Sequence, residues 1–268
     1  MGLRGGIFVK RYFNIYKECI SVSIAAAVAY RMNFILSAII MLLGDIIFPL
    51  ITILIYRSGA GFTGWSVYQV LLIQSVFTMS MAIADMTFHG ILWSTMSGVR
   101  DGNFEMTLLM PVDTIFLLMA RSFSVDALGL FFGGVTIFVV SLVHIGVPTL
   151  FMWLQFLLLF FVGLFVMMGI AFLMAATSFK WVGNSRIPEI FDSLRNFGKY
   201  PQSIFPKSVL VISSYMIPVA MIGYFPAAAL MGTANFTMFI AIIPCIFFVL
   251  LGVILYRLMI RQYQGVGG

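Results

Sequence analysis

The chain has 268 residues, of which 62% are hydrophobic and only 9% are charged, and its mean hydropathy is +1.10. Soluble domains carry about a quarter charged residues, so this composition excludes a water-covered globule and predicts an all-α, polytopic membrane protein in a lipid bilayer. The net charge of +6 would suit nucleic-acid binding in a soluble protein, but in so apolar a chain we interpret it as an orientation signal.

Residues 1–32 combine basic, aromatic and aliphatic side chains at near-helical spacing. This pattern predicts an amphipathic helix that lies in the headgroup region of the membrane. A plain tail that merges into the first span is the alternative interpretation.

Residues 33–258 are expected to form a transmembrane domain with six spans, followed by a tail at 259–268. About 20 apolar residues cross a bilayer, and five segments reach that length without strong interruption: 34–55, 67–96, 116–143, 150–178 and 236–256. Residues 209–231 are the remaining candidate, although Pro218 and Pro226 interrupt them.

Three acidic residues fall inside these expected spans: Asp45, Asp85 and Asp126. Charged groups in lipid are costly, so each is expected to face protein or water. One interpretation places Asp45, Asp85 and the nearby His89 on a translocation pathway. The other gives each acid a static partner, with Asp85 paired to His89 and Asp126 to Arg121.

A second polar block occupies residues 180–207 and carries seven charged residues. Apolar residues recur at spacings of three and four within it, which predicts a short amphipathic helix. Hydropathy alone therefore places residues 186–199 at the membrane surface. Asp192, Arg195 and Lys199 become pathway candidates only if this segment enters the bilayer.

Basic residues indicate the orientation. With six crossings and both termini on one side, thirteen of the 15 Lys and Arg residues fall on that side and only Arg57 falls in an outer loop. The positive-inside rule then predicts cytosolic termini and a cytosolic segment at 98–113, in a cytoplasmic (inner) membrane.

Motifs for an enzyme are missing from the sequence. It has no glycine-rich loop that ends in Gly-Lys-Ser/Thr, no His-Glu-x-x-His and no Gly-x-Ser-x-Gly. His89 and His144 fall near opposite ends of their spans, so they cannot share a metal. We expect no catalytic site, no metal site and no bound cofactor in this chain.

The segment 98–113 reads GVRDGNFEMTLLMPVD and is the one cluster of charges between residues 58 and 179. Its core resembles the connection between the second and third spans of type-2 ATP-binding-cassette (ABC) transporter permeases. Proline-marked stretches at 200–206, 217–220 and 224–227 are similar to those of a bacterial subfamily of permeases of about this length. The resemblance extends over essentially the whole chain.

The resemblance implies that residues 99–111 form a coupling helix that docks on a separate ATPase subunit, which would bind ATP and Mg²⁺. In this interpretation apolar anchors insert into the partner, charges set the register, Gly102 allows a sharp turn and Pro111 ends the element. The anchors would be Phe104, Leu108 and Leu109, and the charges Arg100, Asp101 and Glu105.

The family pattern also implies a different fifth span. It would make residues 186–202 the span and residues 205–231 a re-entrant hairpin. We favour the interfacial interpretation of 186–199, because its apolar face is too narrow for a helix surrounded by lipid.

The function expected from the sequence is that of a permease subunit of an ABC exporter, paired with itself or with a sister permease. A stand-alone secondary transporter or channel that uses Asp45 and Asp85 is one alternative. A membrane anchor whose 98–113 segment recruits a soluble partner is another. The sequence does not indicate the substrate.

Overall fold

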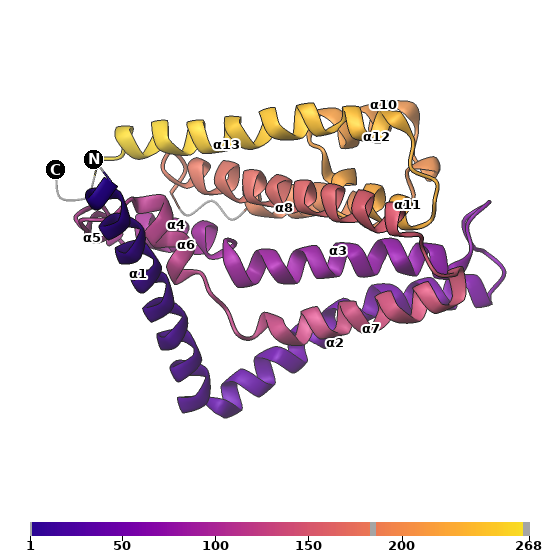
Figure 1. Cartoon of the computed structure of the whole chain (residues 1–268), viewed down its shortest axis with the longest axis horizontal. Coiled ribbons are helices and arrows are strands. Elements are labelled where there is room, and N and C mark those ends of the chain that lie inside the picture. Colours follow the sequence, from indigo (N-terminus) through magenta and orange to yellow (C-terminus); the bar gives the residue numbers. More distant parts are fainter. Residues whose placement is uncertain (1, 183–185, 265–268) are drawn as a thin grey trace.

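The structure is a computed structural model that describes residues 2–182 and 186–264, with the side chains of residues 2–9 and of Asp45 left outside the description (Figure 1). Throughout these ranges the regular elements are helices, in agreement with the predicted all-α class. Five segments are long and apolar enough to cross a membrane within the described part of the chain. They are α2 (Arg31–Arg57), α3 (Val67–Thr87), α7 (Ala127–Ile145), α8 (Leu150–Ser178) and the joined pair α12 (Phe236–Ile240) and α13 (Ile242–Gln262).

The helices α3 and α8 form the centre of the bundle. Residues 70–78 of α3 are buried, and more than half of the most apolar stretch of α8 is buried as well. By contrast, α2 exposes most of its aliphatic side chains. Long runs of Leu, Ile, Phe and Val on such an exposed helix suit contact with lipid.

Helix α8 shows how the sequence sets these elements. The Thr149 hydroxyl accepts a hydrogen bond from the backbone N–H of Met152 and so caps the helix. No charged residue occurs over its 29 residues. It packs along α13, where a Cβ added at Gly252 would lie 2.8 Å from the Gly169 carbonyl oxygen. Small residues at this crossing let the two backbones approach closely.

Two of the expected spans are each divided into two helices, and the two breaks lie at a similar depth in the bundle. The predicted span at 67–96 divides into α3 and α4 (Gly90–Arg100), and the predicted span at 116–143 divides into α6 (Thr114–Arg121) and α7. At 1.5 Å per residue, α3 is about 31 Å long and α7 about 28 Å. Each matches the hydrocarbon thickness of about 30 Å. We infer that both breaks lie at the membrane edge, with α4, α5 (Phe104–Leu108) and α6 beyond it.

The interfacial interpretation of residues 186–199 is wrong. Phe179 contacts Phe104 at the end of the bundle that holds α5, which we call the α5 end. Further along, Tyr200 contacts Phe62, and Ser203 accepts a hydrogen bond from the indole N–H of Trp65. The chain therefore passes through the bundle to the opposite end between residues 179 and 203.

The crossing consists of α9 (Arg186–Arg195) and a 3-10 turn, Asn196–Lys199. These 14 residues span about 23 Å, and the segment is too short to be among the five long apolar helices. Hydropathy missed the crossing because charged side chains occupy it.

Residues 205–231 do not form a span. They divide into α10 (Lys207–Val211), a π-helical turn at Ile212–Met216, a 3-10 turn at Val219–Met221 and α11 (Tyr224–Leu230). The chain enters beside Trp65 at Ser203 and returns to it at Tyr224, whose ring lies 6.0 Å from the indole. Between these points the carbonyl of Ile222 accepts a hydrogen bond from Ser80 inside α3. Entry and exit at one end agree with the re-entrant hairpin that the resemblance implied.

The hairpin depends on one close approach to α8. A Cβ at Gly163 would lie 2.4 Å from the Met221 carbonyl oxygen. Gly163→Ala is therefore expected to force the backbones apart and to destabilise the fold by about 1–3 kcal/mol. Gly44→Ala, where nothing lies within 4 Å, is the matched control. Thermal unfolding of both variants in detergent can be monitored by tryptophan fluorescence. The Tm of Gly163→Ala should be lower than that of the parent, and the Tm of Gly44→Ala should be unchanged. Equal Tm values for the two variants would contradict the packing described.

Candidate functional site

The α5 end carries the segment predicted to couple to a partner. Gly102 has a φ of +71°, the left-handed conformation in which glycine is favoured. The backbone N–H of Asn103 returns to the Gly98 carbonyl at 2.8 Å and closes the turn. Helix α5 then lies across the tip between α4 and α6.

Helix α5 is held from inside by one aromatic side chain. The Phe104 ring is only 1% exposed, and its centroid lies 5.1 Å from Phe179 and 5.6 Å from Tyr263. Tyr256 extends this cluster beneath Phe179. The expectation that Phe104 is an exposed anchor for a partner is wrong, because its ring joins α5 to the ends of α8 and α13.

The outward face of α5 belongs to other residues. Leu109 is 83% exposed, whereas Leu108 is half-buried against the core, and the anchor role of both stays a prediction. Met106 and Met110 are exposed beside Leu109. Met106 lies within α5, whereas Leu109 is its C-cap residue and Met110 follows it. Neither methionine was expected from the sequence to contribute to this surface.

Charged groups surround this face. Arg100 donates a hydrogen bond to Asp101 at 2.9 Å, and the Asp101 carboxylate raises the pKa of the guanidinium. Glu105 is exposed. Burial, and to a lesser extent the nearby Glu105 carboxylate, raises the pKa of the Tyr263 phenol. The face therefore combines an apolar centre with a charged rim, the composition typical of a docking site.

Helix α1 (Gly2–Ala29) is also tied to the segment. The Arg11 guanidinium donates a hydrogen bond to the carbonyl oxygen of Pro111 at 3.1 Å. Next to it, the rings of Tyr12 and Phe116 meet edge to face, with centroids 4.6 Å apart. A displacement of residues 99–111 would therefore reach α1 as well as α8 and α13.

Among the pathway candidates, Asp85 and His89 pair with each other through the Asp85 carboxylate and the ring Nδ1. This is the static arrangement that the sequence analysis left open. Asp45 lies on α2, and its side chain is outside the described residues. No ion pair between Asp126 and Arg121 occurs in the described ranges.

The polar block brings two cations into the bundle. Arg195 is 8% exposed and donates to Asp192 at 2.7 Å. Lys199 is 7% exposed, with its ammonium 3.9 Å from the ring centroid of Phe48 on α2 and 5.0 Å from that of Phe77 on α3. Aromatic faces attract a cation and lower the cost of its burial.

A buried amide lies near the space between the rings of Phe48 and Phe77 that holds the Lys199 ammonium, which we call the Lys199 slot. Gln74 on α3 donates through Nε2 to the hydroxyl of Thr52 on α2 at 2.8 Å, and its Oε1 has no partner among the described residues. Sequence reasoning missed both residues because neither is charged. No group of three or more His, Cys, Asp or Glu side chains could hold a metal within the part of the chain searched.

Comparison with known proteins gives one result for this architecture. A family model described as "ABC-2 family transporter protein" matches residues 39–267. This range includes the α5 end, the polar block and the re-entrant hairpin. No curated protein and no solved structure matches the chain.

Phe104 on α5 and Leu109 at its C-terminal cap should differ sharply in their effect on stability. Phe104→Ala removes a ring from a closed aromatic cluster and is expected to cost roughly 3–5 kcal/mol. Leu109→Ala, at an exposed position, should stay within about 0.5 kcal/mol of the parent. Thermal unfolding in detergent measures both. Comparable losses at the two positions would mean that Phe104 is not the internal anchor.

Proposed function

Because the chain belongs to the ABC-2 family of transporter proteins, we propose that it is the permease subunit of an exporter whose ATPase subunits dock on residues 99–111. The family places it in a membrane as a multi-pass transport component with ATPase partner subunits. The direction of transport and the docking surface are the parts that we propose.

The exposed face of α5 carries this proposal. It presents Met106, Leu109 and Met110 at the tip of the bundle, beyond the inferred membrane edge. Methionine side chains adapt to irregular partner surfaces, and Leu109 supplies a branched apolar group at the centre. Glu105 and the Arg100–Asp101 pair would set the register with charges on the partner.

Transmission would follow the contacts behind that face. The Phe104 ring links α5 to α8 and α13, and the Arg11–Pro111 hydrogen bond links it to α1. ATP and Mg²⁺ would bind to the partner, so this chain would receive the movement without hydrolysing ATP. The α5 end, with the end of α13, would then face the cytosol from a cytoplasmic membrane.

A second permease subunit, either a copy of this chain or a sister, completes the proposal. Lys199 packs against Phe48 on α2, a helix that exposes most of its aliphatic side chains, so a second subunit that covered α2 would lie close to Lys199. We propose that Asp192, Arg195 and Lys199 lie near a pathway between two such subunits. Asp45 stays a candidate on α2, and Asp85 with His89 would stabilise the α3–α4 break.

Replacing Leu109 with Glu tests docking directly. The charge would be buried against the partner, so the affinity of the ATPase for the permease should fall at least about tenfold. The control is Val147→Glu, which adds the same charge at an exposed position at the opposite end. Binding is measured with the detergent-purified chain and candidate ABC ATPase subunits, and stimulated ATP hydrolysis with both in liposomes.

Phe104→Leu separates docking from transmission. It preserves the exposed face and most of the buried volume, so the ATPase should bind with unchanged affinity while its stimulation falls. Unchanged binding in Leu109→Glu would contradict the proposed docking surface. Substrate flux in liposomes that lack the ATPase would instead favour a stand-alone transporter.

A further inference from the structure

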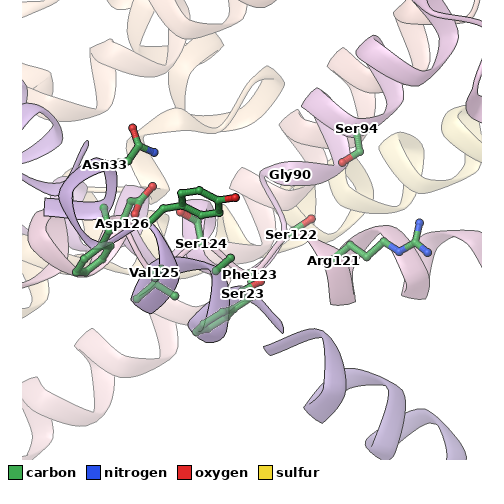
Figure 2. A pocket seen from close by; sticks show the side chains of 14 residues that line it. Ser23, Asn33, Gly90, Ser94, Arg121, Ser122, Phe123, Ser124, Val125 and Asp126 are labelled. Atoms are coloured by element: carbon green, nitrogen blue, oxygen red, sulfur yellow. The ribbon is translucent and has the colours of Figure 1, made fainter. Parts of the chain in front are cut away.

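A cavity of about 430 Å³ opens at the bend between α1 and α2 (Figure 2). Its wall comes from the end of α1, the start of α2, α4, and the break between α6 and α7. Eight of the 14 lining residues carry a polar group: Ser23, Tyr30, Asn33, Ser94, Arg121, Ser122, Ser124 and Asp126. Neither the coupling contacts nor the Lys199 slot uses any of them.

The cavity exists because three chain bends lie together. Helix α3 breaks at Phe88–His89, and α6 gives way to α7 over residues 122–126. These breaks touch, since a Cβ at Gly90 would lie 2.6 Å from the Ser122 hydroxyl. Helix α1 turns into α2 at Tyr30, and Figure 1 shows α1 and α2 forming a V beside this crossing.

The depth of the cavity follows from the helix lengths. Asp126 immediately precedes α7, whose 19 residues match the hydrocarbon thickness. Gly90 immediately follows the break at the end of α3. The cavity therefore lies at the edge of the hydrocarbon on the α5 side, where lipid headgroups are found.

Opposite charges occupy different parts of the cavity. Figure 2 shows Asp126 near Asn33, with Arg121 on the far side and its guanidinium extending away from the carboxylate. Among the side chains that the structure describes, neither Asp126 nor Arg121 forms an ion pair. A ligand that carries both signs of charge would complement this separation.

Hydrogen-bond donors lie between the two charges. The backbone N–H groups of residues 123–126 donate to no backbone carbonyl in the described part of the chain. Ser94 on α4 and Ser124 in the α6–α7 break also line the cavity. Together they could satisfy the oxygens of a phosphate group, which accepts several hydrogen bonds at once.

We propose that this cavity binds the headgroup of a zwitterionic phospholipid with a primary ammonium, such as phosphatidylethanolamine. The phosphate would accept hydrogen bonds from the 123–126 backbone and Ser124, with Arg121 at the rim. The ammonium would donate to the Asp126 carboxylate and the Asn33 amide oxygen. A headgroup with only negative charge would leave Asp126 unpaired and would be repelled by it.

This inference requires only that the chain lies in a membrane, so it can be tested without an ATPase. The full chain is placed in lipid nanodiscs of phosphatidylcholine with a trace of photoactivatable phosphatidylethanolamine. Cross-linked peptides are then identified by mass spectrometry. We expect labelling of residues 23–34 and 121–126, displaced by unlabelled phosphatidylethanolamine but not by phosphatidylglycerol or inorganic phosphate.

Asp126→Asn should reduce this labelling at least about tenfold, because the neutral amide loses the charged hydrogen bond to the ammonium. Glu18→Gln is the matched control, because Glu18 is an exposed acid on α1 that does not line the cavity, and it should label like the parent. Displacement of the label by phosphatidylglycerol as effectively as by phosphatidylethanolamine, or by inorganic phosphate, would overturn the proposal. An equal loss of labelling in Asp126→Asn and Glu18→Gln would also overturn it. So would cross-links to a second copy of the chain in place of lipid.

Discussion

The burial of the Phe104 ring against Phe179 and Tyr263 is the contact on which the α5 end depends. A helix of five residues has almost no stability of its own in water, because nucleation fixes several residues for each hydrogen bond gained. The buried Phe104 ring supplies the stability that the backbone hydrogen bonds of α5 cannot, because it packs between the ends of α8 and α13. Those two helices pack along their length and meet at Gly169 and Gly252. A force applied to α5 is therefore applied to a continuous pair of helices and not to a loop.

Contacts with aromatic rings and with opposite charges also explain how charged residues occupy the bundle. Lys199 lies between the faces of Phe48 and Phe77, and Arg195 is paired with Asp192, so neither cation faces lipid without compensation. Asp85 and His89 compensate each other at the α3–α4 break. Polar groups thus gather where helices are short, broken or re-entrant. These are the places where backbone groups also need partners or access to water.

Much of this architecture could be predicted from the sequence, and the exceptions have physical causes. The α8 boundaries were predicted at 150–178 and agree with the structure, because a cap precedes a long run without charge. The breaks at Phe88 and at residues 122–126 were missed, since hydropathy averages over a bend. The crossing by α9 was not favoured because its apolar face looks too narrow for a helix in lipid, and a sequence does not show that Phe48 and Phe77 receive the Lys199 ammonium. Phe104 was assigned to the outer face because spacing identifies which residues share a face, not which way it points. The family match over residues 39–267 agrees with the resemblance found at 98–113 and in the proline-marked stretches.

If an ATPase subunit docks on residues 99–111 as proposed, α5 should move as one body with the ends of α8 and α13 when that subunit binds ATP. Spin labels at Asn103 and Gln262 would report this directly, in a chain whose Cys19 and Cys245 are replaced by alanine and which is assembled with its ATPase. The distance between the two labels is measured by pulsed electron–electron double resonance and should be the same with and without ATP. The distance from Asn103 to a label on the ATPase should change. A nucleotide-dependent change in the distance from Asn103 to Gln262 would show that α5 slides independently and would contradict the account.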